Sequence, residues 1–169
     1  MKRIMLFSVI CLVAGFAKAQ KLKDSEVPAS VKQTFAKNFP KAKEVKWSKE
    51  GTSEFEAEFV RGTSDSFGEN AEVEQSANFD KTGKWLETET EIKKSELPQA
   101  VQAAIAKEFA GFTVDEPEKV ESPGNVLLYE MELKKDKVKY EVQFSADGKV
   151  VKKEEKKAEE KKEGKEDKD

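Results

Sequence analysis

Glutamates at alternate positions are the residues of this chain whose spacing could do chemistry. They occur in short runs, and as a set they are Glu54, Glu56, Glu58, Glu72, Glu74, Glu130, Glu132 and Glu141. Because side chains alternate between the two faces of a strand, each run predicts an acidic row on one sheet face. Clustered carboxylate oxygens suit calcium or a cationic partner. Alternation alone also produces a solvated strand face, whose charge lysines relieve, such as Lys46, Lys137 and Lys139.

The residue types of most enzymatic chemistry are missing. The sequence contains no histidine, and its single cysteine, Cys11, lies in the N-terminal apolar segment. Histidine is the commonest general base and a frequent zinc ligand, so the usual triads and most transition-metal sites are excluded. Serine–lysine and carboxylate pairs remain, but in a chain that is 38% charged such pairs arise by chance. We therefore predict no enzyme, no catalytic residue, no metal and no cofactor.

Four aromatic residues leave a choice between packing and binding. Trp47 and Tyr129 share strand parity with apolar neighbours, which favours the core for both. Trp85 has an apolar neighbour that competes for the inward position, so core and binding surface stay open. Phe67 lies in the polar loop 61–70, where it contacts a partner or folds onto its own sheet. The predicted partner-binding residues are Glu56, Glu58, Phe67, Trp85, Glu130 and Glu132.

A helix signal that occurs twice must position these residues. The sequence SEVP at 25–28 recurs as SELP at 95–98, and a stripe of apolar residues four positions apart follows each copy. Proline suits the start of a helix, where its missing N–H is not needed. The first helix is predicted over 28–39 and stops at Pro40, whereas Gly111 stops the second.

Four strand-like runs follow each predicted helix. Period-two alternation of apolar and polar residues predicts the runs, and an Asp-Gly type of turn separates the last two in each set. They cover 44–49, 53–60, 71–79 and 85–92, and then 117–122, 126–133, 137–144 and 149–154. The run 85–92 alternates threonine and glutamate, which predicts an exposed strand.

The pattern predicts an α+β fold, a tandem repeat of one helix plus a four-stranded antiparallel sheet. One such unit has a marginal core. We therefore expect the units 20–94 and 95–154 to join into one long sheet with the helices on one face and a shared hydrophobic interior. From Lys152 onward the sequence has nothing to bury, and a charged, disordered tail is predicted over 155–169.

Residues 1–19 have the pattern of a secretory signal peptide. Basic residues precede an apolar run, and small residues predict cleavage between Ala19 and Gln20. No later run approaches the roughly twenty apolar residues of a membrane span. We expect a periplasmic or secreted protein without membrane insertion. Removing the segment's three basic residues takes the formal net charge from −3 to −6, which disfavours nucleic acid as a partner.

Several motifs resemble the exported PepSY-like proteins, also called beta-lactamase-inhibitor-like proteins, which are frequent in Bacteroidetes. These motifs are VKW at 45–47, GKWLETETEI at 83–92 and LPQAV at 97–101. The similarity covers Val27 to about Lys152. It implies a pair of helix-plus-four-strand repeats that form one sheet in a periplasmic or secreted protein. The inhibitor name reflects shared architecture, and it transfers no inhibitory contact to a residue of this chain.

We therefore expect a noncatalytic exported binding module. Its exposed sheet face or its 61–70 loop would engage a protein or peptide that the sequence does not identify, in an oligomeric state that the sequence leaves open. The first alternative is a calcium-responsive envelope protein that uses the glutamate rows. The second alternative is an inhibitor of a secreted hydrolase, which rests on analogy of fold.

Overall fold

One antiparallel sheet dominates the computed structural model, which describes residues 20–51, 53–63 and 72–156. Within this part of the chain, nine strands pair in the order of the sequence, from β1 at one edge to β9 at the other. The fold is therefore α+β with an antiparallel sheet, as predicted. The predicted signal peptide, Phe67 and the chain beyond Lys156 lie outside the described residues.

The elements alternate between short helices and long hairpins. The first half contains β1 (Gln20–Leu22), the 3₁₀ helix η1 (Asp24–Glu26), α1 (Ala29–Asn38), β2 (Ala42–Glu50), β3 (Glu54–Thr63), β4 (Glu72–Asp80) and β5 (Trp85–Glu91). The second half contains η3 (Lys94–Glu96), α2 (Gln99–Glu108), β6 (Thr113–Ser122), β7 (Val126–Lys135), β8 (Val138–Ser145) and β9 (Val150–Lys156). Both predicted helices form, and each starts directly after its proline.

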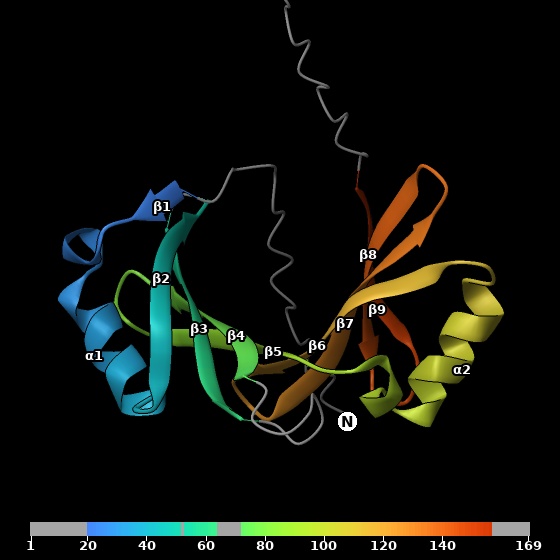
Figure 1. Ribbon diagram of the computed structural model, residues 1–169, viewed down its shortest axis with the longest axis horizontal. Helices are drawn as coiled ribbons and strands as arrows, with labels where there is room; N and C mark the ends of the chain where they lie inside the picture. The colour runs from blue at the N-terminus through green and yellow to red at the C-terminus, as the bar shows by residue number, and fades with distance from the viewer. Residues whose placement is uncertain (1–19, 52, 64–71, 157–169) are drawn as a thin grey trace, which may run out of the picture.

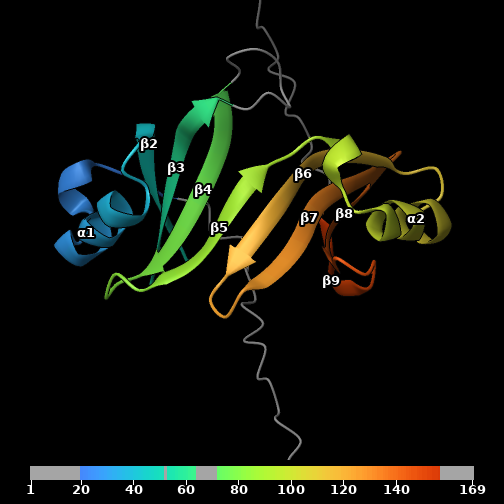
Figure 2. The same ribbon diagram turned by 90° about the horizontal axis from the view of Figure 1, so that it is seen from below.

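The sheet is curved along its length. Figure 1 shows its two ends rising from the central strands, with α1 and α2 on the outer flanks. Figure 2 shows the same sheet from below, with its strands running diagonally between the two helices. We call the inner side of this curve the concave face. In the described part of the chain, neither helix lies on the concave face.

The first hydrophobic core forms where α1 packs on β2, β3 and β4. Helical spacing puts Val31 and Phe35 on one side of α1, and both are buried. The Phe35 ring meets the rings of Trp47 at 5.2 Å and Phe59 at 5.1 Å in edge-to-face geometry. Such pairs add to the free energy gained by burying the rings. Trp47 is therefore a core residue, as its parity predicted.

The second core forms under α2 and is mainly aliphatic. Val101 and Ile105 of α2 pack on the inward residues of β7 and β8, among which Leu133 and Phe144 are fully buried. Tyr129, also predicted to be core, is half-buried and packs against this cluster. Period-two alternation brings these residues to one face because β7 and β8 pair in register.

The expectation of one shared hydrophobic interior is wrong, because the buried residues form two separate clusters. The strands β5 and β6, which join the halves, carry polar residues on the side that continues from the cores. Thr88 lies opposite Glu121, and Thr90 lies opposite Lys119. Polar side chains at these positions interrupt the apolar surface, so each helix buries its own stripe.

Four features differ from the sequence expectation. The last strand, predicted over 149–154, continues to Lys156 as β9, and Lys152 and Lys156 pair with Glu141 of β8. The predicted loop 61–70 begins later, since β3 extends to Thr63. The run 85–92 was predicted to be exposed, but β5 is the central strand of the sheet and is half-buried. The edge strand β1 was not predicted at all.

Two glycine turns fix the helices against the sheet. Gly83 and Gly148 have φ of +85° and +82°, a conformation that favours glycine. A Cβ added at Gly83 would lie 2.5 Å from the carbonyl oxygen of Ser30 in α1. The equivalent Cβ at Gly148 would lie 2.5 Å from the carbonyl oxygen of Ala100 in α2. Each turn therefore touches the first turn of its helix through bare backbone.

We expect Gly83→Ala and Gly148→Ala each to lower the free energy of unfolding by about 3 kcal/mol, because strain at positive φ adds to a backbone clash. Gly124→Ala is the matched control, since Gly124 has φ +83° with nothing within 4 Å of the added Cβ. It should lose about 1 kcal/mol through backbone strain alone. Chemical denaturation measures all three, and equal losses would contradict the close approach.

Candidate functional site

The concave face carries a hollow of about 370 Å³ over β2 to β6, which we call the acidic groove. Eight glutamates line it: Glu44, Glu56, Glu58, Glu74, Glu89, Glu91, Glu116 and Glu118. Lys46 is the basic residue among the lining residues. The volume falls within the range of ordinary ligand sites, but the lining is far more acidic than is usual for them.

Strand alternation explains how β3 contributes to the groove. Glu56 and Glu58 alternate with Phe55, Ala57 and Phe59, which are buried in the first core. Burying the apolar set on one face commits the glutamates to the other face. Both residues were predicted to bind a partner, and the structure places both in the groove.

Two β-bulges aim further glutamates into the groove. The pairing of β2 with β3 shifts between Lys43 and Lys46, and the pairing of β6 with β7 shifts between Asp115 and Glu118. Glu44 and Glu116 lie inside these bulges with φ of 53° and 46°. Non-glycine residues rarely adopt such angles, and bulges re-aim side chains where they occur.

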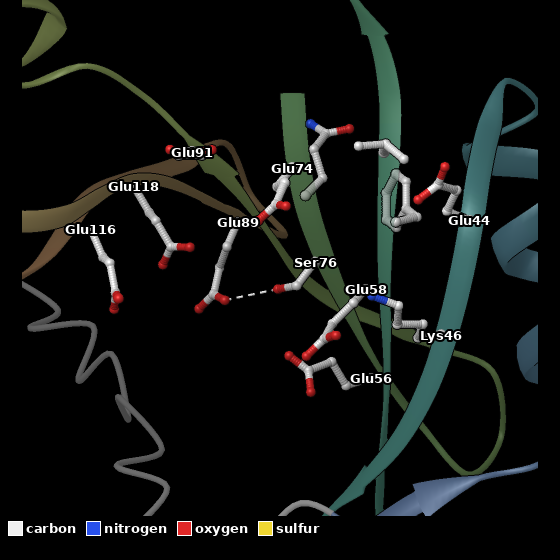
Figure 3. Close-up of a pocket in the computed structure, with 13 residues that line it drawn as sticks. Glu44, Lys46, Glu56, Glu58, Glu74, Ser76, Glu89, Glu91, Glu116 and Glu118 are labelled. Carbon is white, nitrogen blue, oxygen red and sulfur yellow. Dashed lines mark hydrogen bonds between the residues drawn. The ribbon is translucent and has the colours of Figure 1, made fainter. Parts of the chain in front are cut away.

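The floor of the groove is formed by glutamates of the central strands. Figure 3 shows the carboxylates of Glu89, Glu116 and Glu118 pointing the same way, with Glu56 and Glu58 extending toward them. They come from β5, β6 and β3, which are far apart in the sequence but close in the sheet. The resulting surface presents carboxylate oxygens from three strands to one space.

One hydrogen bond anchors the floor to β4. The Ser76 hydroxyl donates to Oε2 of Glu89 at 2.8 Å, and the two residues are cross-strand partners. This bond holds the carboxylate in place and lowers its pKa, but burial acts in the other direction and is stronger.

The central glutamates hold protons more tightly than ordinary carboxylates. Burial, followed by repulsion from Glu118, raises the pKa of Glu89 to about 8. Burial, followed by repulsion from Glu130 and Glu116, raises the pKa of Glu118 to about 7. Burial also raises the pKa of Glu130, against a hydrogen bond from Gln143. The electrostatic character of the groove therefore changes within the neutral pH range.

Lysines compensate the acidic residues farther along the concave face. Glu132 pairs with Lys134 at 2.9 Å and with Lys139, and these bonds outweigh burial and lower its pKa. Glu141 pairs with Lys152 at 3.6 Å and with Lys156 at 2.5 Å. This part of the face therefore matches the sequence alternative of a solvated face relieved by lysines, with Lys139 in the predicted role.

Three carboxylates near these lysines lie close enough to one another to be considered as a cation site. Ligand atoms of Asp115, Glu116 and Glu132 lie within 4.8 Å of one another. However, Lys134 pairs with both Asp115 and Glu132. The ammonium group already supplies the positive charge that a cation would bring, so we assign no metal site here.

Of the other predicted partner-binding residues, Glu130, Glu132 and Trp85 do not line the groove, and Phe67 lies outside the described residues. Glu130 is on the concave face, where Gln143 Nε2 donates to its carboxylate. Trp85 packs against the first core, and its Nε1 donates to the Thr88 hydroxyl at 2.9 Å. The structure thus brings Glu56 and Glu58 together with one another but not with Trp85.

Sequence reasoning missed the glutamates of β2, β5 and β6. Glu89 and Glu91 lie in the run 85–92, for which the sequence predicts an exposed strand. Their even spacing is the same signal that identified Glu56 and Glu58. Glu44 and Glu116 could not have been found by alternation, because each lies in a bulge that breaks it.

The fold and the groove define a class of small α+β proteins with an open, curved antiparallel sheet. The family model described as "putative beta-lactamase-inhibitor-like, PepSY-like" matches residues 15–74 and 53–152. The chain belongs to this family, as its motifs predicted. No curated protein matches the chain. None of the helices in the described residues is long and apolar enough to cross a membrane.

Solved structures from Bacteroides share the fold. A protein of Bacteroides eggerthii described as "putative periplasmic" is 23% identical, with a TM-score of 0.65 over 76% of this chain and 88% of its own. A BLIP-like protein of Bacteroides fragilis is 22% identical, with a TM-score of 0.61 over 79% of this chain and 90% of its own. A DUF2874 family protein of Bacteroides ovatus is 24% identical, with a TM-score of 0.62 over 76% and 86%. At this identity the likeness shows the fold.

We expect Glu89→Gln to stabilise the protein at alkaline pH by about 2 kcal/mol, discounted for partial solvent screening. A carboxyl whose pKa is raised on folding contributes stability below its ordinary pKa of 4.5, and this contribution is lost as the pH rises through about 8. Denaturation as a function of pH measures the effect. The variant should match the wild type near pH 4.5 and exceed it increasingly above that value.

The exposed glutamate Glu108 of α2 provides the control, because Glu108→Gln removes the same charge outside the groove. Its effect should stay within about 0.5 kcal/mol. If the free energy of unfolding depended on pH in the same way for Glu89→Gln and Glu108→Gln, the charge of Glu89 would not destabilise the floor of the groove.

Proposed function

We propose that this protein is a noncatalytic exported binding module whose acidic groove takes a basic segment of a partner protein. The partner would insert lysine or arginine side chains among the glutamates of the groove. The sequence predicted binding on an open sheet face, and this proposal restricts the binding site to the acidic groove and the ligand to a basic segment. Phe67 and Trp85, the aromatic residues predicted to contact a partner, are not needed for this interaction.

The charge of the groove carries the proposal. Eight glutamates and one lysine line a single hollow. Bringing this many carboxylates together costs free energy unless protons or an external cation compensate them. A basic side chain can make short, charge-assisted hydrogen bonds to several carboxylates at once. Charge complementarity of this kind speeds association and selects among partners.

The architecture supports a recognition surface rather than a reaction site. We interpret the two halves as copies of one helix-and-sheet unit, 20–94 and 95–154, with both helices on one face. The ends of the two helices support this interpretation, because each helix starts directly after a proline, Pro28 or Pro98, and is capped at its C-terminus by a phenylalanine, Phe39 or Phe109. Duplication then explains why the opposite face is long, curved and free of helices.

Export is part of the proposal. The pattern of residues 1–19 is that of a signal peptide, and one neighbour in fold is described as periplasmic. In that compartment the partner would be another envelope or secreted protein. Cleavage between Ala19 and Gln20 would leave β1 at the very start of the mature chain.

A fluorescent octalysine peptide tests the groove directly. We expect it to bind the wild-type protein, and we expect Glu58→Gln with Glu118→Gln to weaken binding about tenfold, a loss of about 1.4 kcal/mol. The matched control is Glu108→Gln with Glu155→Gln, two exposed glutamates on α2 and β9, which removes equal charge. Fluorescence anisotropy at physiological salt gives both affinities.

Equal weakening by the two double variants would mean that only net charge attracts the peptide, and it would contradict the proposal. Calcium is the alternative occupant that the sequence raised, and calorimetry with calcium tests it. Heat of binding that disappears in the groove variant but not in the control variant would favour calcium over the peptide.

Inhibition of a secreted hydrolase is the second candidate function. It is favoured by the family description and by the BLIP-like protein of the same fold. A panel of beta-lactamases assayed with and without the protein tests it. Inhibition that Glu58→Gln and Glu118→Gln abolish would identify the partner class, whereas a panel without inhibition would dismiss this candidate for those enzymes.

A further inference from the structure

Three neighbouring strands each place one half-buried glutamate in a row across the centre of the concave face. Glu89 is on β5, Glu118 on β6 and Glu130 on β7. Glu118 and Glu130 are direct cross-strand partners. The cross-strand partner of Glu118 on β5 is Glu91, and Glu89 precedes Glu91 by two residues, so it points to the same face. Like charges at such positions repel one another. We call these residues the glutamate row.

Acidic groups surround the first member of the row. Glu89 is repelled by Glu118, Glu130 and Glu87, in that order of strength. Among the described residues, Ser76 on β4 donates the one hydrogen bond that the carboxylate of Glu89 accepts. A single neutral donor compensates much less charge than a lysine would, so the ionised form of Glu89 is disfavoured.

The middle member of the row has acidic neighbours on its own strand and on three others. Glu118 faces Glu130 on β7, Glu116 on its own strand, Glu91 on β5 and, more weakly, Glu56 on β3. No basic group enters this set. Burial adds to the repulsion, because a half-buried carboxylate has lost part of its hydration.

The last member of the row has a lysine among its neighbours in the described residues. Glu130 accepts a hydrogen bond from Gln143, is repelled by Glu141 and Glu87, and is attracted by Lys152. Lys152, however, also pairs with Glu141 on β8 and with Glu154 on its own strand. The charge of this lysine is therefore shared, and it compensates the row incompletely.

We propose that the glutamate row stores protons at neutral pH and exchanges them for the cationic segment that fills the groove. This inference rests on the proposed function. Each exchange breaks a carboxylic acid O–H bond, passes the proton to water and leaves a carboxylate that pairs with a ligand ammonium group. Binding therefore tightens as the pH rises, and acidification releases the ligand.

The values for the row agree with this exchange. A pKa of about 8 for Glu89 and about 7 for Glu118 means that both carboxyls are partly protonated near pH 7.5. Lysine side chains of the ligand remain charged there, since their ordinary pKa is about 10.4. The pH dependence of binding would then come from the protein.

The first test needs no ligand. Carbon-13 NMR titration of the glutamate side-chain carboxyl carbons, assigned with Glu89→Gln and Glu118→Gln, follows each member of the row. We expect the signals of Glu89 and Glu118 to titrate well above the ordinary value of 4.5. Titration of both near 4.5 would overturn the exchange even if the octalysine peptide binds, and it would leave the proposed function standing.

The second test measures the exchange itself. Calorimetry with octalysine at about pH 7.5, in two buffers of different ionisation enthalpy, should show release of about one proton per peptide. Affinity should rise about tenfold over one pH unit in this range. Glu108→Gln should keep this release, whereas Glu89→Gln with Glu118→Gln should abolish it.

The two failures can be told apart. Elevated titration of the row without any binding of octalysine overturns the proposed function and the exchange with it. Binding without proton release overturns the exchange alone. Proton release that persists in Glu89→Gln with Glu118→Gln also overturns the assignment to the row, because the protons would then come from other groups.

Discussion

The alternation of side chains along antiparallel strands is the constraint on which the rest of this structure depends. The strands β2, β3 and β4 bury aromatic residues or alanine on one face, and alternation places the intervening glutamates on the other face. The strands β7 and β8 repeat this alternation under α2, whereas β5 and β6 carry polar residues on the side that continues from the cores. The same hydrophobic burial that stabilises the fold thus concentrates carboxylates, at an electrostatic cost that the apolar contacts offset.

Charge compensation divides the concave face into two regions with different chemistry. In the second half, Lys139, Lys152 and Lys156 lie across from glutamates and pair with them. Over the central strands, the lysine neighbours are replaced by further glutamates such as Glu91 and Glu118. The difference is one of a few side chains, yet it separates a surface compensated by lysines from a surface lined mainly by carboxylates.

Local sequence signals predicted much of the fold. The proline helix starts, the apolar stripes and the period-two runs gave both helices and eight of the strands, with boundaries shifted by a few residues. These features depend on neighbours in the chain. Glu56 and Glu58 were identified for the same reason, because their strand is regular and its inward residues are unmistakably apolar.

What the sequence could not provide is the arrangement of residues that meet across strands. The polar pairs of β5 and β6 divide the interior only because those strands are neighbours. Glu44 and Glu116 line the groove because they lie in bulges, and the periodicity of the sequence does not predict bulges. The central position of β5 likewise follows from pairing, and pairing turned a run that looked solvated into the floor of the groove.

The order of the strands in the sheet also has a kinetic consequence. Every strand pairs with the strand that comes next in the chain, so six of the eight pairings can close as hairpins or near-hairpins, while the β1–β2 pairing spans α1 and the β5–β6 pairing spans α2. Short closures carry little entropic cost, and folds rich in them reach the native state quickly. Strand pairing in such a sheet can therefore begin at either end. During synthesis, the first helix and strands can fold before the rest of the chain has left the ribosome.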